Sequence, residues 1–212
     1  MRYNGFPILK VVVGGPYHSG KTTTIRSLDP NATCLERKQA DGKTTTVGFD
    51  VGKLVLCNHN GTDCILSQQD FDMKKDELIE YDQVTTLLLF GCAGQMRFKD
   101  VRKATLRGAK GVLFVVDSTN PGHIGHCVAL FEEIRIILGE DIPLVVLANK
   151  QDLPESLNAD KINELLSIEG IPIFETSALT GVGITKALLK LVHLITRKEA
   201  DSDKELRNLS LI

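Results

Sequence analysis

An eight-residue motif near the N-terminus has the residue types and spacing of a phosphate-binding loop. Gly15-Pro16-Tyr17-His18-Ser19-Gly20-Lys21-Thr22 matches G-x-x-x-x-G-K-[S/T] at every fixed position. In such a loop, backbone N–H groups surround phosphate oxygens, the lysine reaches the terminal phosphates and the threonine hydroxyl binds Mg²⁺. The expected nucleotide-binding residues here are Gly15, Tyr17, His18, Ser19, Gly20, Lys21, Thr22 and Thr23, with Thr22 as a Mg²⁺ ligand.

A second motif, Asn149-Lys150-Gln151-Asp152, follows an apolar run and has the chemistry to select guanine. The Asp152 carboxylate can accept hydrogen bonds from the guanine N1–H and 2-amino groups. Adenine offers neither donor, so it would leave a buried carboxylate unpaired. Asn149 can hold the loop, and Lys150 can lie over the base. In Thr176-Ser177-Ala178, we expect Ser177 and Ala178 to offer a backbone N–H to the guanine O6. The two motifs together predict GTP and GDP as ligands.

Alternating apolar runs and helix-period segments predict the elements that position these motifs. Short β-branched or apolar runs predict strands over residues 8–13, 47–57, 64–66, 84–90, 111–116, 143–148 and 171–176. Helices are expected over residues 21–28, 129–138 and 184–195. This alternation is typical of an α/β fold with a mostly parallel sheet and helices on both faces.

Length and composition exclude several classes of protein. The 212 residues are 42% hydrophobic and 25% charged, as in ordinary globular domains. A net charge of -2 argues against a nucleic-acid-binding surface, and no apolar run is long enough to span a membrane. Five scattered cysteines indicate free thiols in a reducing, cytoplasmic environment. Arg2 and the absence of cysteine from the last residues predict no direct lipid anchor.

The motifs together resemble those of the Ras-superfamily small GTPases. Residues 148–154 (ANKQDLP) are most similar to the Arf-like branch, and residues 93–98 (AGQMRF) to the Rab and Ras branch. The resemblance implies a three-layer P-loop NTPase fold with a six-stranded, mostly parallel sheet, one antiparallel edge strand and helices on both faces. It also implies a small GTPase domain over residues 1–197, followed by a charged tail, 198–212, that we expect to fray.

The same resemblance implies roles for three residues outside the two motifs. Thr46 is similar to the threonine that ligates Mg²⁺ and senses the γ-phosphate, and the Gly94 N–H can meet that phosphate. Gln95 is similar to the glutamine that orients the attacking water, the alternative being an exposed glutamine at a helix start. The expected catalytic residues are thus Lys21, Gly94 and Gln95. Effector, exchange or activating proteins are expected to bind through residues 31–49 and 94–107.

Two residues depart from the family pattern. Gly91 stands where the family has an aspartate that holds a Mg²⁺-bound water, so a weaker metal site is expected. Gly91→Asp should then lower the Mg²⁺ requirement. Asp117 is the nearest compensating carboxylate in the sequence, although capping the following loop is its favoured role. Tyr17 either crowds the γ-phosphate and Gln95 or points toward solvent or a partner.

The segment between Thr46 and Gly91 is longer than the family usually needs, so residues 67–83 are interpreted as an insertion. It either binds a partner or forms a solvated loop with a short helix at 76–81. Nearby, Cys57, His59 and Cys64 offer three soft ligands for zinc, although buried strand thiols are favoured.

These observations predict a GTP-binding molecular switch with slow, Mg²⁺-dependent GTP hydrolysis. The alternative is a non-hydrolysing binding module that nucleotide stabilises. Gln95 and Thr46 favour the enzyme, whereas Gly91 and Tyr17 favour the binding module.

Overall fold

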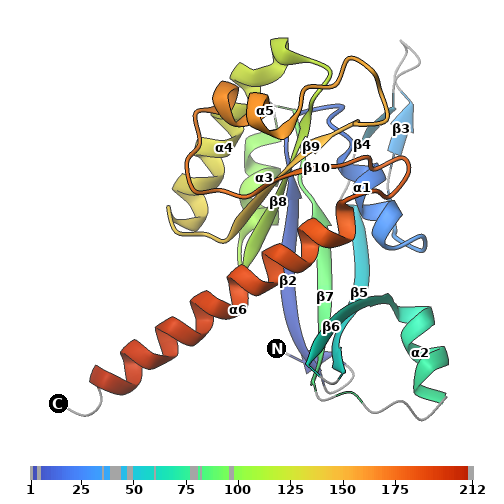
Figure 1. Ribbon diagram of the computed structural model, residues 1–212, viewed down its shortest axis with the longest axis vertical. Helices are drawn as coiled ribbons and strands as arrows, with labels where there is room; N and C mark the ends of the chain where they lie inside the picture. Colours follow the sequence, from blue (N-terminus) through green and yellow to red (C-terminus); the bar gives the residue numbers. More distant parts are fainter. Residues whose placement is uncertain are drawn as a thin grey trace.

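The computed structural model describes residues 2–3, 6–34, 36–38, 44–46, 50–59, 61–76, 81, 83–95 and 98–209 (Figure 1). The strands are β1 (Arg2–Tyr3), β2 (Phe6–Gly14), β3 (Glu36–Lys38), β4 (Thr44–Thr46), β5 (Val51–His59), β6 (Thr62–Ser67), β7 (Gln83–Gly91), β8 (Gly111–Asp117), β9 (Leu144–Asn149) and β10 (Ile173–Glu175). The α-helices are α1 (Lys21–Leu28), α2 (Gln68–Asp76), α3 (Lys99–Leu106), α4 (Ile124–Leu138), α5 (Ala159–Leu166) and α6 (Ile184–Leu209).

The main sheet has the order β10-β9-β8-β2-β7-β5-β6, with β1 paired to β2 beside this path. The strands from β10 to β7 are parallel, whereas β5 is antiparallel to both β7 and β6. The predicted α/β fold with a mostly parallel sheet is therefore confirmed. The path contains seven strands rather than six. The turn after β5 continues the antiparallel edge into β6, with Gly61 at φ 78°.

The structure has a helix earlier than the one expected at residues 76–81: α2 spans Gln68–Asp76, and Tyr81 is not helical. Residues 77–80 lie outside the described part of the chain. The earlier start follows from capping, because the Asp70 N–H donates to Ser67 Oγ at 3.1 Å. Phe71 is buried, and its ring lies 6.1 Å from that of Phe6. This contact holds α2 near the N-terminal end of β2.

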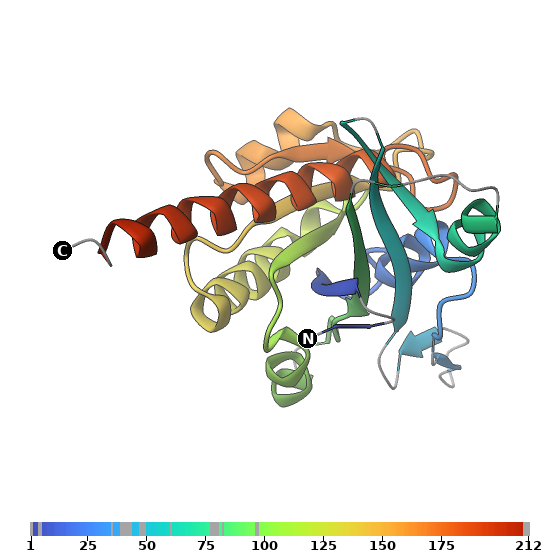
Figure 2. The same ribbon diagram turned by 90° about the horizontal axis from the view of Figure 1, so that it is seen from below.

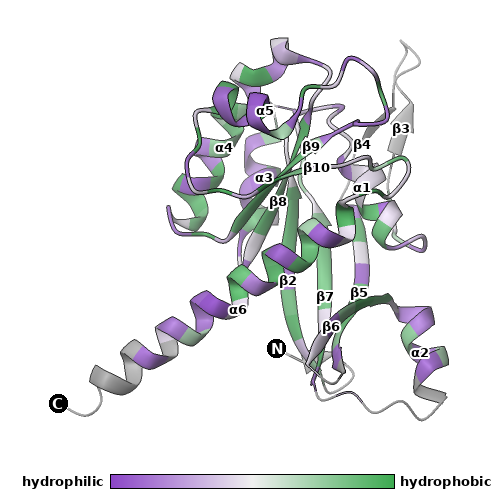
Figure 3. Ribbon diagram, in the orientation of Figure 1, coloured by the Kyte–Doolittle hydropathy of each residue, from purple (hydrophilic) through white to green (hydrophobic). Residues whose placement is uncertain are grey.

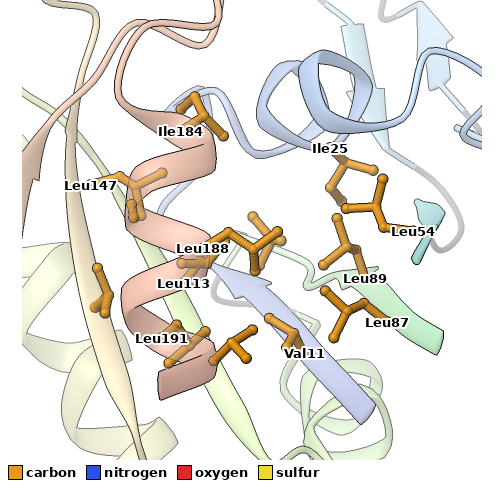
Figure 4. Packing of buried hydrophobic residues seen from close by; sticks show 14 of the residues in the cluster. Val11, Ile25, Leu54, Leu87, Leu89, Leu113, Leu147, Ile184, Leu188 and Leu191 are labelled. Carbon is orange, nitrogen blue, oxygen red and sulfur yellow. The ribbon is translucent and has the colours of Figure 1, made fainter. Parts of the chain in front are cut away.

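Two hydrophobic layers cover the two faces of the sheet. On one face, α1 and α6 pack Ile25 and Leu188 toward strand residues that include Val11 (Figure 4). On the other face, α3, α4 and α5 pack against a layer that includes Val12 and Phe114. Neighbouring residues of β2 thus enter different cores, as the alternation of side chains along a strand requires. The sheet is therefore buried on both faces, which fixes the strand ends that carry the functional motifs.

The last helix extends further than the sequence predicted. α6 runs from Ile184 to Leu209, and its second half projects beyond the sheet (Figures 1 and 2). Of the segment expected to fray, residues 198–209 are helical. They contain neither glycine nor proline, and Lys198 Nζ donates to the Asp141 carbonyl at 2.7 Å. The coloured part of the projecting half is largely hydrophilic (Figure 3). Among the described residues, no helix combines the length and apolarity needed to cross a bilayer.

Candidate nucleotide-binding site

The phosphate-binding motif forms the turn between β2 and α1, as predicted. Gly15 and Gly20 have φ angles of 131° and 103°, which L side chains rarely adopt. A Cβ on Gly15 would overlap the Val115 carbonyl oxygen, and one on Gly20 would overlap the Asn149 amide. Both glycines are therefore required by backbone conformation and by close neighbours.

A pocket opens where this loop faces the end of β7. The predicted residues that line it are Tyr17, His18, Gly20, Lys21, Thr22, Thr23, Gly94, Gln95 and Lys150. Its remaining lining residues are Asp50, Gly91, Cys92, Ala93 and Phe98. The loop and the residues after β7, far apart in sequence, thus meet around one space.

Lys21 is a half-buried cation that lines this pocket. Its Nζ donates to the Pro16 carbonyl at 2.6 Å. Burial lowers the pKa of Lys21 to about 8, although the nearby Cys92 and Asp50 act in the opposite direction. A phosphate group beside Nζ would favour the charged form, so phosphate binding and protonation of Lys21 are coupled.

We expect GDP binding to take up protons above about pH 8, because burial lowers the pKa of Lys21 and leaves more of it neutral in the unbound protein. Below that pH the uptake should be smaller, because more of Lys21 is then protonated before binding. Affinity should accordingly decrease as the pH rises above 8. Calorimetry in buffers of different ionisation enthalpy measures the uptake. Equal uptake above and below about pH 8 would contradict the lowered pKa.

Gly94 and Gln95 lie against the phosphate loop. A Cβ on Gly94 would come within 2.7 Å of both Lys21 Nζ and the Tyr17 nitrogen, so only glycine permits this approach. The Gln95 carbonyl accepts a hydrogen bond from Arg102, which is 3% exposed and also pairs with Glu133 at 2.8 Å. The start of the segment 94–107 is thereby tied to α3 and α4. Residues 96 and 97 lie outside the described part of the chain.

The second motif forms a pocket that continues from the first. Its lining residues are Gly20, Thr23, Asn149, Lys150, Asp152, Leu153, Ala178 and Leu179. Three of these, Gly20, Thr23 and Lys150, also line the phosphate pocket. The predicted base-selecting and phosphate-binding residues thus border adjoining spaces.

Asn149 joins the two pockets in the way the sequence predicted. Its Nδ2 donates to the Ser19 carbonyl at 2.8 Å, and its Oδ1 accepts from the Ala178 N–H at 2.8 Å. The Asp152 Oδ1 accepts from the Ser177 hydroxyl at 2.5 Å, which orients the carboxylate. One amide therefore fixes the phosphate loop relative to the loop that carries Ala178.

Three predicted residues support the pockets without lining them: Gly15, Ser19 and Ser177. Gly15 permits the turn, buried Ser19 supplies a carbonyl to Asn149, and Ser177 orients Asp152. The Ala178 N–H, expected to meet the guanine O6, already donates to Asn149. If this N–H also donated to the guanine O6, its hydrogen bond would be shared between the base and Asn149 Oδ1.

Asp117 caps the loop after β8 and does not line the phosphate pocket. Its Oδ1 accepts from the Thr119 N–H at 3.1 Å and from the Thr119 hydroxyl at 2.7 Å. Its Oδ2 pairs with Lys150 Nζ at 2.5 Å. Burial alone would raise the pKa of Asp117, but the bonds from Lys150 and Thr119 outweigh it and lower that pKa. The capping role is confirmed, and compensation for Gly91 by this residue is wrong.

The residues present fit a Mg²⁺ ion, which prefers oxygen ligands. The Thr22 hydroxyl faces the pocket and donates to the Asp50 carboxylate at 2.6 Å. Sequence reasoning missed Asp50, which directly precedes β5 where that strand begins at the pocket. Thr46, the other predicted ligand, ends β4, but its side chain lies outside the described part of the chain.

Tyr17 lines the phosphate pocket together with Gly94 and Gln95. Its ring centroid lies 3.7 Å from that of His18, which is exposed. Crowding of the γ-phosphate by Tyr17 stays a prediction.

Cys57 and Cys64 face each other across β5 and β6. Burial raises the pKa of Cys57 to about 12, and its thiol lies 3.7 Å from the Cys64 carbonyl. Within the described residues, no group of three His, Cys, Asp or Glu side chains is placed to hold a metal. The side chain of His59 lies outside those residues. Cys57 fits the description of a buried strand thiol, whereas Cys64 is half-buried.

Comparison with known proteins agrees with this geometry. Residues 36–197 match the Ras family. Ras-related protein Rab-4 of Dictyostelium discoideum is 29% identical over 94% of this chain and 90% of its own length. Mutual gliding-motility protein MglA of Myxococcus xanthus is 31% identical over 86% of this chain and 89% of its own. ADP-ribosylation factor-like protein 6 of Caenorhabditis elegans is 29% identical over 74% of this chain and 88% of its own length.

The fold and the two adjoining pockets define a P-loop nucleotide-binding protein. The chain belongs to the Ras superfamily of small GTPases. Its relatives come from the Rab, Arf-like and MglA groups. The chain as a whole is thus similar to more than one branch of the superfamily, as its short motifs are.

Proposed function

We propose that this protein is a GTP-binding switch that hydrolyses GTP slowly in the presence of Mg²⁺. The observation that carries the proposal is the Asn149 amide, which links the phosphate loop to the base pocket through Ser19 and Ala178. Members of this superfamily bind GTP and GDP and act through regulators and effectors. Free cysteines throughout the described residues support a reducing compartment such as the cytoplasm.

In this proposal, some residues of the site bind the nucleotide and others promote its hydrolysis. Lys21 neutralises the terminal phosphates, and the Gly94 N–H meets the γ-phosphate. Gln95 orients the attacking water, while Asp152 holds the base. Thr22 and Thr46 would hold Mg²⁺, which when bound neutralises charge on the phosphate oxygens. Slow turnover is proposed to follow from Tyr17, which lines the same pocket as Gln95.

Partners are proposed to bind through residues 31–49 and 94–107. The second segment includes Gly94, which contacts the phosphate loop, and Arg102, which ties the segment to α4. A γ-phosphate between Lys21 and Gly94 would alter this contact. Exchange, activating or effector proteins that bind this surface would thus distinguish the GTP-bound form from the GDP-bound form.

GDP should bind at least about a thousandfold more tightly than ADP, because a site built to bond polar groups strongly rejects a ligand that lacks them. Displacement of fluorescent GDP by each unlabelled nucleotide, with Mg²⁺ present, measures the ratio. Affinities for GDP and ADP within about tenfold of each other would overturn the assignment of the base pocket.

The alternative is a binding module that holds GTP without hydrolysing it. Tyr17 favours it, because this half-buried residue lines the same pocket as Gln95 and a phenol there would restrict the attacking water. The two functions differ in whether one protein molecule releases more than one phosphate.

A further inference from the structure

Residues 50 and 91 lie directly opposite each other where β5 and β7 meet the phosphate pocket. The two strands are antiparallel, with Val51 paired to Phe90. The next pair in the register is Asp50 and Gly91, and the Gly91 N–H donates to the Asp50 carbonyl at 2.8 Å. Both residues line the pocket. A carboxylate at either position would therefore reach the same end of the sheet.

The side chain of Asp50 occupies the space into which a side chain at position 91 would project. A Cβ on Gly91 would lie 2.8 Å from the Asp50 Cβ and 3.0 Å from its Oδ2. Ile25 Cδ1 would be 3.2 Å away. Since Cβ contacts under 3.0 Å require movement of the neighbour, the two positions cannot both carry a side chain in this arrangement. Glycine at 91 leaves the room that Asp50 uses.

The Asp50 carboxylate is fixed in this space and directed at the phosphate loop. It is 2% exposed, and its Oδ2 accepts the Thr22 hydroxyl proton at 2.6 Å. A hydroxyl that donates its proton to a carboxylate keeps its lone pairs for a cation. Burial lowers the pKa of Lys21, and Asp50 is close enough to oppose that effect. Asp50 thus lies beside both phosphate-loop side chains that the metal–nucleotide complex requires.

We infer that Asp50 is the acidic positioning residue of the Mg²⁺ site, in place of the aspartate that Gly91 replaces. It orients the Thr22 hydroxyl and supplies negative charge beside the metal position. This inference rests on the proposed GTP-binding function. The metal site has therefore not lost its carboxylate, which is supplied by the neighbouring strand.

The test measures release of fluorescent GDP as Mg²⁺ is titrated, which requires no hydrolysis. In Asp50→Asn, a variant of nearly equal volume, the Mg²⁺ concentration for half-maximal retention should rise about 10–100-fold. Release in the presence of a chelator should stay close to that of the unaltered protein. Asp29→Asn is the matched control, because Asp29 is 6% exposed beside β5 but does not line the pocket. Its midpoint should be unchanged, with thermal unfolding confirming that both variants fold.

A paired exchange makes the test independent of the Asn substitution. Asp50→Gly should raise the Mg²⁺ concentration needed for half-maximal GDP retention. Adding Gly91→Asp to this variant should bring that concentration back to within about tenfold of the original. Superimposable Mg²⁺ curves for Asp50→Asn and the unaltered protein would overturn the inference and leave the proposed function intact. Failure of the unaltered protein to bind GDP at any Mg²⁺ concentration would overturn both.

Discussion

Asp152→Asn is expected to weaken GDP and GTP binding by at least about tenfold and to raise the relative affinity for xanthosine nucleotides. The Asp152 carboxylate can accept from two donors on guanine, whereas an asparagine amide presents its own N–H groups to one of them. Xanthine carries a carbonyl in place of the 2-amino group, so it matches that amide. The Oδ1 that accepts from Ser177 at 2.5 Å is retained in asparagine, so the loop should stay in place.

Competition between GDP and xanthosine diphosphate for the variant and for the unaltered protein measures this change of preference. Asp160→Asn, an exposed acid in the first turn of α5, is a control that should keep the guanine preference. An unchanged base preference in Asp152→Asn would show that the base binds elsewhere.

Gly91→Asp is expected to destabilise the protein by about 3 kcal/mol or more and to impair Mg²⁺-dependent nucleotide binding. Overpacking a filled site costs about 1–3 kcal/mol, and a Cβ here would lie 2.8 Å from the Asp50 Cβ. A second carboxylate beside Asp50 adds the cost of burying two like charges. This reverses the expectation from sequence, in which the same substitution improves the metal site.

Thermal unfolding of Gly91→Asp and Gly91→Ala separates the two contributions, because alanine adds the Cβ without the charge. The alanine variant should be destabilised less than the aspartate variant. If Gly91→Asp unfolds at the original temperature and needs less Mg²⁺ to retain GDP, the space beside Asp50 is larger than described and the sequence-based expectation is correct.

The residues that sequence predicted well are those whose role follows from neighbours along the chain. The turn from Gly15 to Thr22 requires glycine conformations and a following helix, which are local properties. Asn149 and Asp152 were similarly recognisable, since a polar motif directly after a buried strand lies at the edge of the sheet.

Asp50 was missed because its role depends on pairing between strands distant in sequence. The chain between β5 and β7 contains β6 and α2, so spacing does not place residue 50 opposite residue 91. Asp117 was the nearer acid along the chain, but the structure pairs it with Lys150.

Helix ends were the other weak point. The start of α2 depends on the Ser67 cap. The helix α5, which was not predicted from the sequence, starts after Asn158, whose side chain accepts from the Lys161 N–H. The continuation of α6 is supported by contacts with other elements, such as Lys198 with the Asp141 carbonyl. The helical period of apolar residues stops at Ile195, so it could not predict that α6 continues beyond that residue.

Multiple-turnover phosphate release from GTP tests most directly whether this protein is a hydrolysing switch. We expect several phosphates per protein molecule, slowly and only with Mg²⁺. The Asp152→Asn variant supplied with xanthosine triphosphate should also turn over, which distinguishes the protein's own activity from a contaminating GTPase. Release that stops at or below one phosphate per protein, while GTP stays bound, would contradict the account and identify the protein as a nucleotide-stabilised binding module.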